Sequence, residues 1–212
     1  MKLPRFLNVV AAMAALIAGA AQAEVIDFED VPIGDYQQFT SQGFDFVLSN
    51  DAASIVNTQV CTPLCPVNGT HLLLAPYTNN LQISKSGASF DIAGFQGSGS
   101  FYIPPGSSFS GATHINVVGH LSGGGVVTQS FVINQTPVAG SLPLTSFLFN
   151  GSFRNLTSIN FSSSGAVNND AINGFALDNI VMAAPVPEPE TYAMLLSGLG
   201  LAGLAARRKA KA

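Results

Sequence analysis

Alternating apolar and polar residues dominate the middle of the chain, between positions 24 and 184. Short runs rich in Val, Ile, Phe and Thr are interrupted, about every eight to twelve residues, by Gly, Ser, Asn or Pro. Alternation with a period of two is typical of strands that bury one face, and no stretch has the period of about 3.6 residues that marks an amphipathic helix. We therefore expect one all-β domain, built as a two-sheet jelly-roll sandwich.

Strands are predicted wherever this alternation runs uninterrupted. The candidate strands are 25–28, 44–48, 54–60, 71–74, 81–84, 89–95, 100–103, 113–119, 126–133, 146–149, 156–161 and 175–182. The stretch HLSGGGV at 120–126 predicts a hairpin, because its glycines supply the positive φ angles that tight turns need. Phe44 and Phe46 lie two positions apart, as do Phe147 and Phe149. Each pair therefore points to one face and is expected in the core.

The N-terminal residues 1–23 predict a secretory signal peptide. Basic residues precede an apolar run that ends in AQA at 21–23. The run is too short and too rich in alanine for a membrane anchor, which is the alternative. Cleavage is expected between Ala23 and Glu24, and it leaves an exported ectodomain at 24–184.

The C-terminal segment 185–212 combines three unlike elements in a fixed order. A Pro-Glu-Pro motif is followed by an uncharged run, 191–206, and then by a basic tail. The defining residues are Pro187, Glu188, Pro189, Arg207 and Arg208. As a helix, the uncharged run would rise about 24 Å, which is short for a hydrocarbon core of about 30 Å. A basic tail after an exported domain is expected to stay in the cytoplasm.

This order closely resembles the PEP-CTERM sorting signal, and a plain tail anchor is the alternative. The resemblance implies recognition by an exosortase, a membrane-embedded transpeptidase-like enzyme, which removes the transmembrane helix near the Pro-Glu-Pro. It also implies transient residence in the inner membrane of a Gram-negative bacterium. Release to the cell surface or to an extracellular matrix, such as that of a biofilm, would follow.

The charges within 24–184 exclude one class of partner. This region has ten acidic residues but only two basic ones, Lys85 and Arg154. Two cations cannot neutralise a phosphate backbone, so the composition excludes nucleic acid as a partner. The acidic excess favours cations instead.

The two cysteines, Cys61 and Cys65, lie close together in the stretch CTPLC. Their three-residue gap differs from the two-residue gap of redox and zinc motifs, and no second pair is present to complete a zinc site. An exported protein enters an oxidising compartment, so we expect a local disulfide. A loop this small constrains little of the unfolded chain.

A second resemblance involves the two ends of the ectodomain. IDFED at 26–30, GFDF at 43–46 and NGFALDNI at 173–180 are similar to the ends of carbohydrate-binding and MAM-like jelly-roll modules. In those families the first and last strands lie near each other, and several members hold a structural calcium there.

Acidic residues near these ends predict a calcium site. Asp27 and Glu29 have the same parity on the first expected strand, Asp178 lies on the last, and Asp30 follows the first. Calcium prefers hard carboxylate and carbonyl oxygens, and few bases are present to compensate the acids. Glu29 and Asp178 are the first candidate ligands, followed by Asp27 and Asp30. The alternative is a solvated acidic edge that discourages aggregation.

No pattern in the sequence predicts an enzyme. The G-x-S-x-G and H-E-x-x-H motifs are absent. His114 and His120 lie six positions apart on one expected strand, about 20 Å from each other, so they cannot share a metal. We therefore expect a non-catalytic protein with no cofactor other than calcium.

Tyrosines indicate a glycan as the ligand of an alternative function. Tyr36, Tyr77 and Tyr102 are candidate platforms, because sugar faces stack on exposed rings. The sequence has no Trp, and solvated loop tyrosines are the simpler interpretation. The predicted function is thus adhesion or a structural role in the envelope or matrix. A specific carbohydrate-binding module, with extracellular polysaccharide as its partner, is the alternative.

Overall fold

The computed structural model describes most of the ectodomain and little of the two termini. Its described residues are 23–57, 66, 68–76, 80–100, 111–134, 136, 138, 141–166, 173–183, 197–198 and 203. Ala23–Ala183 form one compact unit, and 1–22 with 184–212 form the second. No helix within the described ranges has the length and apolar character needed to span a membrane. The predicted signal peptide and nearly all of the predicted sorting signal lie outside these ranges.

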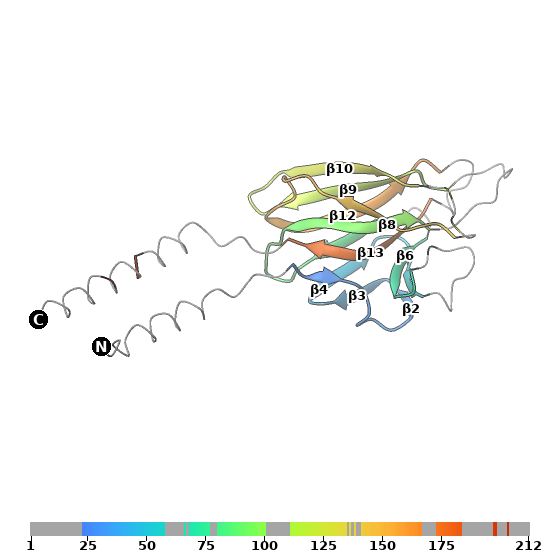
Figure 1. Cartoon of the computed structure of the whole chain (residues 1–212), viewed down its shortest axis with the longest axis horizontal. Coiled ribbons are helices and arrows are strands. Elements are labelled where there is room, and N and C mark those ends of the chain that lie inside the picture. Colours follow the sequence, from blue (N-terminus) through green and yellow to red (C-terminus); the bar gives the residue numbers. More distant parts are fainter. Residues whose placement is uncertain are drawn as a thin grey trace, which may run out of the picture. The chain divides into compact units, whose positions relative to one another are not determined.

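The described strands form two antiparallel sheets (Figure 1). In order across sheet A, the strands are β11 (Thr145–Leu148), β8 (Ile92–Gly99), β13 (Phe175–Met182), β6 (Leu72–Ala75), β5 (Ala53–Val56) and β2 (Gly34–Tyr36), with β1 (Val25–Ile26) also pairing with β13. In order across sheet B, they are β10 (Val126–Val132), β9 (His114–Leu121), β12 (Leu156–Ser164), β7 (Leu81–Ser84), β4 (Phe44–Leu48) and β3 (Gln38–Ser41). The predicted all-β, two-sheet sandwich is confirmed.

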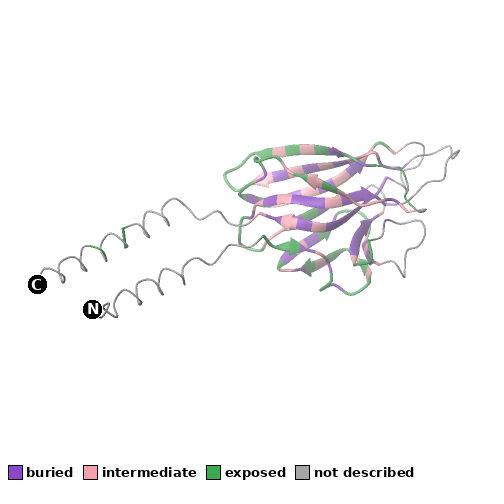
Figure 2. Cartoon of the chain, viewed as in Figure 1, coloured by how far each residue is buried: buried purple, intermediate pink, exposed green. Residues whose placement is uncertain are grey.

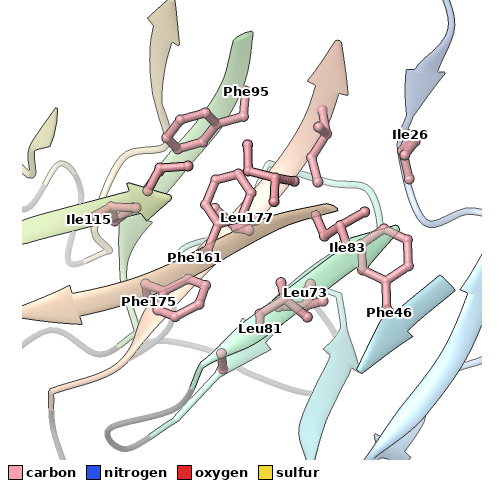
Figure 3. Packing of buried hydrophobic residues seen from close by; sticks show 14 of the residues in the cluster. Ile26, Phe46, Leu73, Leu81, Ile83, Phe95, Ile115, Phe161, Phe175 and Leu177 are labelled. Carbon is pink, nitrogen blue, oxygen red and sulfur yellow. The ribbon is translucent and has the colours of Figure 1, made fainter. Parts of the chain in front are cut away.

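Phenylalanine and aliphatic side chains from both sheets fill the space between them (Figure 3). Phe175 and Leu177 come from sheet A, and Ile115 and Phe161 come from sheet B, and none of the four has exposed surface. Phe95 packs edge-to-face on Phe161 with 5.3 Å between ring centroids. Each such aromatic pair adds about 0.5–1.5 kcal/mol beyond the burial of its area. The alternation in the sequence thus becomes one shared core.

The observed strands at 44–48, 81–84 and 175–182 have the predicted bounds, whereas the first strand does not. β1 ends at Ile26, because Phe28 adopts a φ of 60°, which is incompatible with a strand. Asp27 and Glu29 therefore lie in the turn that follows β1, and the expectation that they share one face of a strand is wrong.

Two strands were not predicted, and two predicted strands extend beyond the described ranges. β2 and β3 are short, polar edge strands in a stretch with no apolar alternation. The predicted strand at 54–60 is observed as far as Val56, and most of the predicted strand at 100–103 lies outside the description.

The hairpin predicted at HLSGGGV joins β9 to β10. Leu121 N donates to Gly125 O at 3.1 Å, and Gly124 N donates to Leu121 O at 3.0 Å. Gly124 and Gly125 have φ angles of 87° and 89°, which side chains with a Cβ rarely adopt. The prediction is confirmed, and the turn fixes the register of the two strands.

The first and last strands pair, as predicted, and define one end of the sandwich. Val25 pairs with Val181 in the antiparallel β1–β13 ladder. Beyond that pair, Met182 N donates to Glu24 O at 2.8 Å. We call this the terminal end, because both ends of the domain leave from it. β13 begins at the opposite, distal end, where Ser100 N donates to Gly174 O at 3.2 Å.

Candidate functional site

Asp178 is a buried carboxylate in the second half of β13, towards the terminal end. Its side chain belongs to a residue with no exposed surface. Oδ2 accepts hydrogen bonds from the amide of Asn68, from Thr70 Oγ1 at 3.3 Å and from Asn179 Nδ2 at 3.0 Å. Oδ1 accepts a bond from Asn179 N at 2.7 Å. Neutral donors thus surround this acid.

Burial is the largest influence on the protonation of this group, and it raises the pKa of Asp178. The hydrogen bonds from Asn68, Asn179 and Thr70 act in the opposite direction, because they stabilise the charged form. The negative charge of Asp27 adds a smaller upward contribution. The structure thus brings Asp27 and Asp178 within electrostatic range of each other, as the calcium hypothesis requires.

Glu29 connects the turn after β1 to the start of β6. Its Oε1 accepts a hydrogen bond from His71 N at 2.7 Å. The Nδ1 atom of His71 lies 3.3 Å from Phe28 O and 3.1 Å from Val31 O. Both neighbours are carbonyl acceptors, so Nδ1 carries a proton and donates. The histidine thereby holds the turn in place from beneath.

Asp27 and Asp30 bind the turn after β1 to the hairpin between β3 and β4. Asp30 Oδ1 accepts a bond from Ser41 Oγ at 2.6 Å, and Oδ2 accepts one from Gln42 N at 2.8 Å. Asp27 Oδ1 accepts a bond from Gln42 Nε2 at 2.9 Å and from Glu29 N at 3.3 Å. Each carboxylate therefore joins segments that are distant in sequence.

The four predicted calcium ligands thus occupy one end of the domain, but they engage protein donors. Within the described part of the chain, no three His, Cys, Asp or Glu side chains are grouped as a metal site requires. The backbone is constrained there: Phe28, Gln42 and Asn179 have φ angles of 60°, 47° and 45°. Such conformations in non-glycine residues persist only where the surroundings enforce them. Calcium binding stays a prediction.

The residues that bind the carboxylates are those that sequence reasoning missed. Asn68, Thr70, Ser41 and Gln42 are neutral and lie in turns or next to short strands. Acidic residues attract attention as candidate ligands, whereas no periodicity or spacing connects an asparagine to an acid far along the chain. Only the fold brings them together.

The candidate glycan and disulfide residues are mostly outside the described ranges. Cys61, Cys65, Tyr77 and Tyr102 all lie there. Tyr36 is described: its ring is half-buried on β2, 5.6 Å from the ring of Phe39. Its hydroxyl donates to Pro32 O at 3.0 Å. The ring is therefore held in a fixed orientation at the edge of sheet A.

The chain also resembles two solved structures at low identity. One is the crystal structure of the enzymatically active domain of tailspike protein 4 from bacteriophage CBA120, with 14% identity and a TM-score of 0.31 over 75% of this chain and 20% of that chain. The other is the family 11 carbohydrate-binding module of the cellulosomal cellulase Lic26A-Cel5E of Clostridium thermocellum, with 9% identity and a TM-score of 0.31 over 81% of this chain and 99% of that chain. This chain thus spans about a fifth of the length of the tailspike chain. At such identities, no functional statement about this chain follows from either likeness.

No curated protein matches the sequence. Residues 185–209 do match a described family, the PEP-CTERM protein-sorting motif. The match covers the Pro-Glu-Pro, the apolar run and the first basic residues of the tail. The chain therefore carries a PEP-CTERM protein-sorting motif, and it is an exported protein of the exosortase-sorted class.

Proposed function

We propose that the chain is a non-catalytic protein of the cell surface or extracellular matrix of a Gram-negative bacterium, where its sandwich acts by adhesion or as a structural element. The observation that carries this proposal is the position of the sorting motif. The motif begins at residue 185, directly after β13, which ends at Met182. An exosortase would therefore act next to a completed domain.

The arrangement of the domain's ends supports display from one side. Val25 and Val181 pair at the terminal end, and Lys85 Nζ lies 3.5 Å from Glu24 Oε2 beside them. A domain held through residue 183 presents its distal end away from the attachment. The strands that start or finish there, including β13, β8 and β9, would face the surroundings, which in this proposal are matrix polysaccharide or neighbouring proteins.

The partners of the histidines support a non-catalytic role. His71 Nδ1 contacts two backbone carbonyls, and His114 Nδ1 lies 2.8 Å from Thr113 Oγ1. His120 Nε2 lies 3.4 Å from Asn160 Nδ2. A catalytic histidine in a nucleophile–base pair is oriented by a third group, which is commonly a carboxylate. The contacts of these described side chains have a different character.

Processing provides the experiment. Intact-mass analysis of the protein released to the surface should show loss of 1–23 and of the residues beyond about Pro189. Glu188→Ala should retain the protein in the inner membrane, whereas Glu190→Ala, which leaves the Pro-Glu-Pro intact, should be released normally. A surface form that still carries ARRKAKA, or equal release of both variants, would contradict the proposal.

A specific carbohydrate-binding module is the second candidate, favoured by the fixed ring of Tyr36. A glycan array probed with the processed protein should then show several-fold selectivity for one class of sugar. Tyr36→Ala should weaken that binding, and Tyr36→Phe should preserve it, because stacking requires the ring and not the hydroxyl. Uniform weak signals across the array would leave adhesion without sugar specificity as the function.

A further inference from the structure

β10 forms an outer edge of sheet B that is longer than the other edges. It has seven residues and pairs with β9 on one side. In the described part of the chain, no strand pairs with its other side. The remaining sheet edges are β2 with three residues and β3 and β11 with four each. Natural proteins usually shorten or protect such edges, because a free edge can pair with another chain.

Two hydrogen bonds show which backbone groups of β10 are free. Ile133 N donates to Thr113 O at 2.9 Å, and Leu121 N donates to Gly125 O at 3.1 Å. Both bonds involve odd-numbered residues on the β10 side. In an antiparallel ladder, the residues between such positions direct their N–H and C=O groups to the opposite side. The free groups are therefore those of Val126, Thr128, Ser130 and Val132.

The inward side chains hold this edge rigidly. Phe131 is buried, and its ring packs edge-to-face on Phe95 at 5.1 Å and on Phe149 at 5.3 Å. Gln129 Nε2 donates to Leu148 O at 3.2 Å, and its Oε1 accepts a bond from Asn150 N at 3.0 Å. Gln129 thus occupies backbone groups at the end of β11 and ties the two sheets together. The outer edge of β10 has no such cover.

The sequence of β10, VVTQSFV, is nearly symmetric about Gln129. Valines lie at both ends, hydroxyl residues flank the centre, and large apolar residues lie between them. The two end residues are exposed apolar side chains, with Val126 57% and Val132 69% exposed. Figure 2 shows the exposed positions that recur along this strand. A strand that is its own chemical mirror suits a two-fold interface, in which each residue meets its counterpart.

We propose that two copies of this chain pair antiparallel through β10, about a two-fold axis at Gln129. Val126 of each copy then lies opposite Val132 of the other, and Thr128 lies opposite Ser130. These four residues carry the free backbone groups, so each opposed pair exchanges two hydrogen bonds. Outward side chains meet outward side chains, which preserves the pleat across the junction.

Charge and register both favour this arrangement. Residues 121–134 contain no Lys, Arg, Asp or Glu, so nothing repels a second copy. A shift of two residues in either direction would leave one exposed valine of each copy without its counterpart. The contact is confined to an edge and buries little area, so the dimer is expected to be weak and to depend on concentration. Many copies held on one surface would strengthen it through their high local concentration.

Sedimentation velocity of the processed protein, released by the cells that produce it, tests the proposal. The wild type should shift from monomer to dimer as its concentration rises through the micromolar range. Thr128→Pro removes a free edge N–H that the fold does not use, so it should abolish dimerisation and leave the melting temperature nearly unchanged. Val47→Lys, at an exposed valine on β4, is the control and should dimerise like the wild type.

Charge complementation tests the register. The double variants Thr128→Lys/Ser130→Lys and Thr128→Glu/Ser130→Glu should each be monomeric, and an equal mixture of the two should form a heterodimer. A wild type that stays monomeric across the range would overturn the proposal. Dimers that persist in Thr128→Pro, or a mixture that stays monomeric, would overturn it as well.

Discussion

Asn68 and Asp178 lie 110 positions apart in sequence and are joined by a hydrogen bond from the Asn68 amide to Asp178 Oδ2. The bond links the segment before β6 to β13, in the interior of sheet A. Asp178 has no exposed surface, so its oxygens depend on protein donors in place of water. This pair therefore contributes to the stability of the terminal end.

Asp178→Ala should lower the free energy of unfolding by about 2–3 kcal/mol, because it leaves the buried donors of Asn68 and Asn179 without an acceptor. Urea unfolding of the processed protein at neutral pH measures the change. Asp35→Ala is the matched control: its carboxylate bonds Ser54 at an exposed site, so its removal should cost much less. Equal losses in the two variants would contradict this account.

The raised pKa of Asp178 predicts how stability depends on pH. Its pKa in the folded state lies above the ordinary value of 3.8, so between the two values the folded state binds more protons than the unfolded state. The free energy of unfolding contributed by this group therefore falls as pH rises through the folded pKa, and it is constant above. The stability of the wild type minus that of Asp178→Asn should follow this curve. A difference that increases with pH would show that the sign is wrong.

Calcium should raise the melting temperature by several degrees if the predicted site forms, because an ion that binds only the folded state stabilises it. The test compares melts in millimolar calcium and in excess chelator. The shift should vanish in Asp178→Ala and persist in Asp51→Ala, at an exposed acid on another turn. Superimposable melts of the wild type in both buffers would exclude the ion.

Cys61 and Cys65 should be joined in the exported protein. Peptide mapping without reductant should recover them as one cross-linked peptide. Reduction should lower the melting temperature only modestly, because the closed loop is short. Free thiols at both positions in protein that never met a reductant would contradict the prediction.

The alternation of the sequence was enough to predict the sandwich but not its edges. β4, β7 and β13 bury one or both faces, so their apolar side chains mark their bounds. β2 and β3 are polar edge strands, which form because neighbouring strands offer them partners, and no local signal marks them.

The candidate site shows the same limit more sharply. The four acids and their common end of the domain follow from the expected pairing of the first and last strands. The positive φ of Phe28 ends β1 early, however, and places Asp27 and Glu29 in a turn. The bonds from Asn68 to Asp178 and from Gln42 to Asp27 depend on long-range packing, which no pattern of period two encodes.

β13 is the last strand of the domain to be synthesised, and it pairs with β8, β6 and β1 inside sheet A. Sheet A cannot close until residues 175–182 have emerged on the far side of the membrane. The chain is therefore translocated with its most distant contacts still unmade, when its strands are most open to mispairing. The sorting motif follows directly behind that strand. Folding of the domain and arrival of the motif at the membrane are thus nearly simultaneous, and the order of strands along the chain sets the timing of both.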